Sequence, residues 1–285
     1  MVKTAHSPSE NIKQVAGKSI EINQQHTPPI MFNFPKPKLG NVTAITITSA
    51  DLEKSLQFYQ QLGFSELYRA DFPFPWIQVS DGALLIMLRQ DKNPYIAITY
   101  YTNDIENVVA ELKESGIPCK SLPTPDKMIQ RFLITTDEGH NITLVTYVEG
   151  FAQPSGTTML TMKPQDFSNP GKYTNQTCGM FGEYALPVLN LSNSIAFWEK
   201  LGYKTLSKKS SPYPWAILSD GIGIVGLHQT DNFSVPTITF FAADMKDKID
   251  NLKLKGLTDY TEKGDSSIVL NTPEKQNINL FKLGM

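Results

Sequence analysis

The sequence predicts an α+β fold built as two tandem copies of one domain. Residues 42–148 are repeated, with small insertions and deletions, at residues 181–283. The segment Phe58-Tyr-Gln-Gln-Leu-Gly-Phe64 returns as Phe197-Trp-Glu-Lys-Leu-Gly-Tyr203. Within each copy, strand-like and helix-like patterns alternate twice. The chain therefore holds four strand–helix–strands units of about fifty residues each.

Each copy begins with a strand and an amphipathic helix. Residues 42–48 predict the first strand, and the apolar positions after it step by three or four, which places them on one helical face. Gly63 and Gly202 follow as helix stops. The positions on the two helical faces are Leu52, Leu56, Tyr59 and Leu62 in the first copy, and Leu191, Ile195, Trp198 and Leu201 in the second.

Two strands joined at an Asp-Gly dipeptide come next, at Asp81-Gly82 and at Asp220-Gly221. This dipeptide favours a two-residue hairpin turn, because both central residues of that turn need positive φ. Another strand follows at residues 96–101 and 237–241, and then a second helix and further strands complete each copy.

Proline- and glycine-rich segments separate the copies. Residues 1–40 are polar and hold several prolines, which predicts an N-terminal arm without regular structure. Residues 150–180 are rich in proline and glycine and predict a linker. The chain thus divides into a polar arm (1–40), a first domain (41–149), the linker (150–180) and a second domain (181–285).

The amino-acid composition limits the kinds of partner and compartment that we expect for this chain. The chain is 40% hydrophobic and 19% charged, with a net charge of −2, which is typical of a globular protein and gives no electrostatic argument for nucleic acid. No apolar run approaches the roughly 20 residues of a membrane span. Cys119 and Cys178 occupy non-equivalent places in the repeat, which predicts free thiols in a reducing compartment. Because the first thirty residues show no signal-peptide pattern, we expect a cytoplasmic protein.

These features together resemble the vicinal oxygen chelate superfamily, which includes glyoxalase I, the extradiol dioxygenases and the bleomycin-resistance proteins. The resemblance rests on four βαβββ units, on the FYxxLGF segment, on a tryptophan-bearing strand before Asp-Gly, and on the motif from Asp137 to Leu144. It covers residues 42–148 and 181–283. It implies that each pair of units forms a half-open barrel around a small-molecule pocket, where enzymatic members hold a divalent metal.

The metal positions implied by this resemblance carry few ligands. They fall on Ala44 and Thr143 in the first copy, and on Glu183 and Asn279 in the second. A catalytic metal of this kind needs three or four nitrogen or oxygen ligands. The resemblance is therefore closer to the metal-free, bleomycin-resistance-like branch, which binds ligands without chemistry.

The Asp-Gly hairpin of the first copy predicts an aromatic wall. In a two-residue turn, Trp76 faces Met87 and Phe74 faces Arg89. Alternate strand residues share one sheet face, so these four side chains line the same surface. Aromatic rings, a sulfur atom and a cation suit a planar or anionic ligand.

In the second copy, the same register places Trp215 opposite Gly226 and Tyr213 opposite His228. The missing side chain at Gly226 leaves open space above the indole ring. Both tryptophans also fit an ordinary role as core aromatics, because large rings fill protein cores more often than they hold ligands.

Glu183 and His228 are the one pair of residues whose side chains suit acid–base or metal chemistry. A carboxylate and an imidazole on the same face would make a proton relay or half of a metal site. An ordinary Glu–His hydrogen bond, or a solvated glutamate, explains the same residues.

Our preferred hypothesis is a metal-independent small-molecule-binding protein, without a cofactor, that works as a monomer or homodimer. One alternative is a metal-dependent lyase, isomerase or dioxygenase that uses Glu183, His228 and Asn279. Another is a scaffold that acts through protein partners, which continuous side-chain fill between Trp215 and Glu183 would favour. The predicted ligand-binding residues are Tyr213, Trp215, His228, Glu183, Asn279, Phe74, Trp76, Met87 and Arg89.

Overall fold

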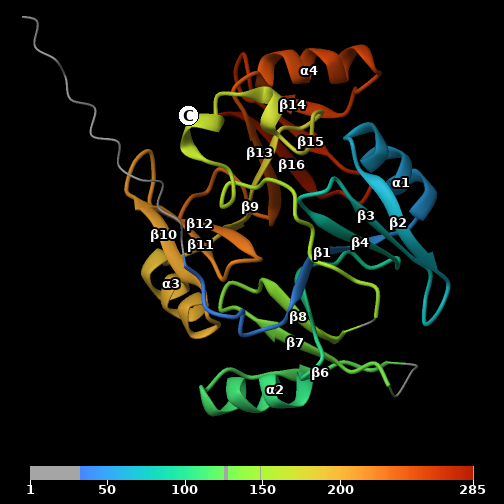
Figure 1. Cartoon of the computed structure of the whole chain (residues 1–285), viewed down its shortest axis with the longest axis vertical. Coiled ribbons are helices and arrows are strands. Elements are labelled where there is room, and N and C mark those ends of the chain that lie inside the picture. Colours follow the sequence, from blue (N-terminus) through green and yellow to red (C-terminus); the bar gives the residue numbers. More distant parts are fainter. Residues whose placement is uncertain (1–32, 125–127, 148, 285) are drawn as a thin grey trace, which may run out of the picture. The chain divides into compact units, whose positions relative to one another are not determined.

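Two eight-stranded sheets, one from each copy, make up the computed structural model (Figure 1). The structure describes residues 33–124, 128–147 and 149–284. Most of the expected N-terminal arm, residues 1–32, lies outside the described residues. Buried apolar side chains from both sheets join in one hydrophobic core, so the two copies share an interior.

The first sheet has the strand order β2-β3-β4-β1-β5-β8-β7-β6. Its central strands β1 and β5 are antiparallel, whereas β1 with β4 and β5 with β8 run parallel. The elements are β1 (Val42–Ser49), α1 (Leu52–Gln61), β2 (Ser65–Ala70), β3 (Trp76–Ser80), β4 (Leu85–Gln90), β5 (Ile96–Thr102), α2 (Ile105–Glu114), β6 (Lys120–Ser121), β7 (Arg131–Thr135) and β8 (Asn141–Thr146).

The second sheet repeats this order as β10-β11-β12-β9-β13-β16-β15-β14, which confirms the predicted duplication and α+β class. Neither sheet closes into a full barrel. The elements are η1 (Pro164–Asp166), η2 (Pro170–Lys172), β9 (Met180–Pro187), α3 (Leu191–Lys200), β10 (Lys204–Lys209), β11 (Trp215–Ser219), β12 (Ile224–His228), β13 (Thr237–Ala242), α4 (Met245–Leu254), β14 (Tyr260–Glu262), β15 (Ile268–Asn271) and β16 (Asn277–Lys282).

The first helix of each copy forms where its pattern predicts. Asp51 caps α1 by accepting a hydrogen bond from the Lys54 N–H at 3.0 Å, and Asn190 caps α3 in the same way. Gly63 and Gly202 end the helices with φ of 87° and 95°, a conformation that glycine adopts without strain. No helix in the described part of the chain is long and apolar enough to cross a membrane.

The predicted two-residue hairpin turn is wrong. Ser80 pairs with Leu85, so the loop has two more residues than the predicted turn. Only Gly82 has positive φ there, whereas the Asp81 carboxylate accepts hydrogen bonds from the N–H groups of Ala83 and Leu84, both at 2.8 Å. A side chain that satisfies two backbone donors stabilises this wider loop.

The register consequently shifts by two residues in both copies. Trp76 faces Arg89 rather than Met87, and Trp215 faces His228 rather than Gly226. Because side chains alternate with a period of two, this shift leaves every residue on its predicted sheet face.

Buried hydrogen bonds join the hairpin of the second copy to the first sheet. Asp220 accepts hydrogen bonds from the Gly223 N–H at 2.8 Å and from the Tyr100 hydroxyl at 2.8 Å. The Tyr203 hydroxyl lies 2.5 Å from the Tyr100 hydroxyl. Since Asp220 is only 1% exposed, these contacts compensate its lost hydration.

The equivalent contact of the first copy uses different residues. Asp81 accepts a hydrogen bond from Asn175 Nδ2 of the linker at 3.0 Å. Phe64 and Phe240 replace the tyrosine pair and pack edge to face, with ring centroids 6.4 Å apart. Both hairpins therefore rest on groups from outside their own copy.

Replacing Asp220 by asparagine tests the effect of burying this carboxyl group. Burial raises the pKa of Asp220 above its ordinary value of 3.8, although the Gly223 N–H and the Tyr100 hydroxyl oppose this shift. A raised folded-state pKa contributes stability that is complete below the unfolded-state pKa and is lost as pH rises through the folded-state pKa. We therefore expect the unfolding free energy of the wild type, relative to Asp220→Asn, to fall as pH rises above about 4, measured by urea titration.

The control is Asp250→Asn, because the exposed Asp250 has a pKa lowered by its hydrogen bond with Lys246. Its contribution has the opposite sign, since it is present above the unfolded-state pKa and is lost as pH falls. A pH-independent difference between the wild type and Asp220→Asn would show that folding does not raise the pKa of Asp220.

Candidate functional site

One face of the second sheet gathers the polar residues predicted from the sequence. Glu183 lies on β9 and pairs with Thr239 on β13, which in turn pairs with Asn279 on β16. On the other side of β9, strand β12 contributes Gly226 and His228 to the same face. We call this surface, carrying these five residues, the Glu183 face.

Glu183 and His228 form a buried pair. Glu183 Oε1 lies 3.0 Å from His228 Nε2, and the two side chains are 5% and 11% exposed. A Cβ atom at Gly226 would lie 1.8 Å from Glu183 Oε2. The space predicted to be open is therefore filled by the carboxylate, which a side chain at position 226 would displace.

Aromatic rings surround the imidazole of His228. The Tyr213 hydroxyl lies 3.3 Å from His228 Nδ1, and the Phe233 ring centroid lies 5.6 Å from that of His228. The half-buried Trp215 faces His228 across the strand pair. Burial raises the pKa of Tyr213 and the negative charge of Glu183 raises it further, so this phenol stays protonated at neutral pH.

The side chains of Glu183 and Asn279 differ in their hydrogen bonding. Glu183 Oε2 is buried and has no hydrogen-bond partner among the described residues. Asn279 donates from Nδ2 to the Thr239 hydroxyl at 3.2 Å. The structure thus brings Glu183, His228 and Tyr213 into one hydrogen-bonded chain, whereas Asn279 bonds within its own strand pair.

The side chains on the Glu183 face do not form a ligand set that fits a catalytic divalent metal. Nowhere in the described ranges do three His, Cys, Asp or Glu side chains come together. Glu183 and His228 supply two potential metal ligands, which are already hydrogen-bonded to each other. Asn279 adds only a neutral amide. Structural and catalytic metals of this type take three or four stronger ligands.

The four predicted residues of the first copy divide into two groups. Trp76 and Met87 join an apolar cluster around Phe151, a linker residue whose ring centroid lies 6.0 Å from that of Trp76. Phe74 and Arg89 meet elsewhere on the sheet, with the Arg89 Cζ 5.1 Å from the Phe74 centroid. Phe151 fills much of this wall, and the predicted pattern gave no sign of it.

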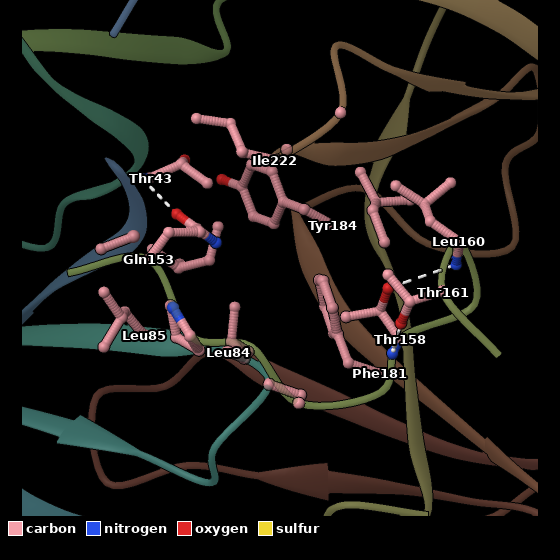
Figure 2. A pocket seen from close by; sticks show the side chains of 18 of the residues that line it. Thr43, Leu84, Leu85, Gln153, Thr158, Leu160, Thr161, Phe181, Tyr184 and Ile222 are labelled. Carbon is pink, nitrogen blue, oxygen red and sulfur yellow. Dashed lines mark hydrogen bonds between the residues drawn. The ribbon is translucent and has the colours of Figure 1, made fainter. Parts of the chain in front are cut away.

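A separate cavity of about 90 Å³ lies between the two sheets under the linker (Figure 2). The Tyr184 ring extends into it from β9, and its buried hydroxyl points toward Thr43 and Gln153 but has no hydrogen-bond partner within the described part of the chain. This volume holds about three water molecules, whereas sites for drug-sized ligands measure roughly 300 Å³ or more. We therefore place the main candidate site on the Glu183 face.

Replacing Gly226 by alanine tests how tightly the Glu183 carboxylate is held. The added methyl group would overlap the carboxylate, so we expect a loss of about 1–3 kcal/mol of unfolding free energy, measured by urea denaturation. In the double variant with Glu183→Ala, the additional loss caused by Gly226→Ala should be smaller, because the main clash is gone. Gly171→Ala is the control, since its Cβ would meet Asn169 at an ordinary 3.4 Å. Strict additivity of the two changes would contradict the packing described here.

Comparisons with known proteins agree with this architecture. Residues 41–144 match the family model described as Glyoxalase/Bleomycin resistance protein/Dioxygenase superfamily. No curated protein sequence matches the chain. The fold is similar to that of the 2,3-dioxygenase LapB from Pseudomonas sp. KL28, with a TM-score of 0.57 and 16% identity over 87% of this chain and 94% of that chain.

Two further solved structures are similar. Homoprotocatechuate 2,3-dioxygenase from Arthrobacter globiformis has a TM-score of 0.56 and 15% identity over 88% of this chain and 82% of its own. The Brevibacterium fuscum enzyme of that name, in complex with 3,4-dihydroxyphenylacetate, has a TM-score of 0.52 and 16% identity over 87% of this chain and 83% of its own. Such low identities establish the fold alone. Residues 41–144 are therefore similar to the glyoxalase/bleomycin resistance protein/dioxygenase superfamily, and the second sheet repeats the strand order of the first.

Proposed function

We propose that this protein binds a small molecule on the Glu183 face without using a metal ion. The observation that carries this proposal is the buried Glu183–His228 pair, in which one carboxylate oxygen has no hydrogen-bond partner among the residues that the structure describes. Leaving a buried acceptor unpaired costs about 1–3 kcal/mol. A ligand could donate a hydrogen bond to this Glu183 oxygen, directly or through a water molecule. Such a bond would offset the cost of burying the carboxylate.

The Glu183–His228 pair also determines which ring nitrogen of His228 is available to a ligand. Because the Glu183 carboxylate accepts the Nε2 proton, a neutral His228 presents Nδ1 as an acceptor toward Tyr213. The Tyr213 hydroxyl is 3.3 Å from this nitrogen, which is longer than most hydrogen bonds. A ligand hydroxyl therefore competes readily for His228 Nδ1.

The surrounding rings indicate the rest of the ligand. Tyr213, Trp215 and Phe233 offer aromatic surface beside His228, and aromatic pairs prefer offset or edge-to-face packing. One similar structure is a complex with 3,4-dihydroxyphenylacetate, a hydroxylated aromatic compound. We therefore propose a hydroxylated aromatic ligand, bound by Tyr213, Trp215, His228, Glu183 and Asn279.

The two copies divide their roles in this proposal. The second domain (181–285) binds the ligand, whereas Phe151 fills much of the corresponding wall in the first domain (41–149). The linker (150–180) supplies both Phe151 and Asn175. Two free cysteines support a reducing, cytoplasmic location, and we propose a monomer or a homodimer as the working form.

The direct test is binding of 3,4-dihydroxyphenylacetate in the presence of EDTA, followed by tryptophan fluorescence. We expect saturable quenching that is lost in Trp215→Phe, because that indole lies beside His228. Glu183→Gln and His228→Gln should each weaken binding about tenfold or more, since the first removes the negative charge of the pair and the second removes the imidazole.

The matched control is Glu53→Gln, which changes an exposed glutamate of α1 and should bind as the wild type does. Absence of saturable quenching in the wild type would refute the proposal. It would favour a scaffold that acts through protein partners, in which His228 simply fills the space between Trp215 and Glu183.

A second candidate function is metal-dependent catalysis on the Glu183 face, favoured by the similarity to dioxygenases. The donor set argues against it, so we expect purified protein to hold far less than one equivalent of iron, manganese, nickel or zinc. Elemental analysis of the wild type and of Glu183→Ala makes this measurement. A full equivalent that disappears in the variant would establish the second candidate instead.

A further inference from the structure

The chain contains three arginines, and two of them share one aromatic ring. Arg69 is paired conventionally with two glutamates at 2.7 and 2.6 Å. Arg89 and Arg131 instead lie over the ring of Phe74, with distances from Cζ to the ring centroid of 5.1 and 5.8 Å. They come from β4 and β7, which are four places apart in the sheet order.

Both arginines lie on the same face of the first sheet. Arg89 pairs with Trp76, and Arg131 pairs with Val145. Both of these partners pack on the cluster around Phe151, which lies on the face opposite the helices. The sheet therefore curves enough to bring two cations from distant strands toward one ring.

These guanidinium groups have little negative charge beside them. Arg89 is 14% exposed, and its carboxylate contact, Asp91, is 3.5 Å away, longer than the roughly 2.8 Å of a strong charged hydrogen bond. Arg131 has no ion pair with any residue that the structure describes. Burial lowers the pKa of Arg131, and the positive charge of Arg89 lowers it further. Two partly desolvated cations repel each other unless an anion compensates them.

A third donor on this face is also unused. Gln78 is opposite Met87, two residues from Arg89 on the neighbouring strand, and is only 1% exposed. Its Nε2 is buried and has no hydrogen-bond partner among the described residues. Buried donors without partners are rare in folded proteins. This face of the first sheet thus has more hydrogen-bond donors than acceptors.

We propose that the first sheet binds a small oxyanion, a carboxylate or a phosphate group, between Arg89 and Arg131, with Gln78 as a further donor on the same face. A guanidinium group presents two parallel N–H bonds that match the spacing of two oxyanion oxygens. The rings of Phe74 and Tyr95 hold Arg89 in place, the latter with its centroid 5.4 Å from Cζ. This site is independent of the Glu183 face.

The test is isothermal titration of the full chain with inorganic phosphate and, separately, with benzoate. We expect saturable binding of at least one probe, weakened about tenfold in Arg131→Gln and in Arg89→Gln. Arg131→Lys should give an intermediate affinity, because it keeps the charge but loses the planar fork. Preference for benzoate identifies an organic carboxylate ligand, and preference for phosphate identifies a phosphate group.

Arg69→Gln is the matched control, since it removes the same charge from an exposed position and should bind both probes as the wild type does. Glu183→Gln should also leave this binding unchanged. Thermal melts without added anion confirm that each variant is folded. The proposal is overturned if the wild type binds neither probe saturably, if Arg131→Gln folds and binds as the wild type does, or if Arg69→Gln weakens binding equally.

Discussion

A buried aspartate at the tip of each long hairpin ties the two copies together. Asp220 accepts a hydrogen bond from Tyr100 of the first sheet, and Asp81 accepts one from Asn175 of the linker. A buried carboxylate that loses such a partner destabilises the folded state strongly. The association of the two sheets therefore uses these polar contacts together with the shared hydrophobic core, and the sheet faces away from them differ between the two copies.

The two faces show how this divergence preserves packing. In the first copy, the small Ala44 on β1 leaves room for Met87 on β4, and both belong to one apolar cluster. In the second copy the sizes are exchanged, because Glu183 on β9 is large and Gly226 on β12 has no side chain. Exchanges that keep total volume are tolerated best in cores. This one also introduces a buried acid, and His228 supplies its partner.

Local sequence patterns were enough to predict the helices and most strands. A Glu183–His228 hydrogen bond was one of the interpretations that the sequence left open. Both side chains lie on their predicted face although the hairpin register was wrong, because a shift of two residues keeps each side chain on its face. Arg131, Phe151 and the cavity beside Tyr184 could not be predicted. Their contacts join segments that are distant in the sequence, and such contacts leave no periodic signal along the chain.

Fusion of the copies explains why the two faces can carry opposite charges. A homodimer of a single domain would place the same groups on both faces, whereas in this chain Glu183 occurs on one face, and Arg89 and Arg131 on the other. The net charge of −2 conceals this separation, because it averages over the whole surface. Similarity of fold to the dioxygenases identifies the scaffold, whereas the ligands that we propose for each sheet follow from the carboxylate on one and the guanidinium groups on the other.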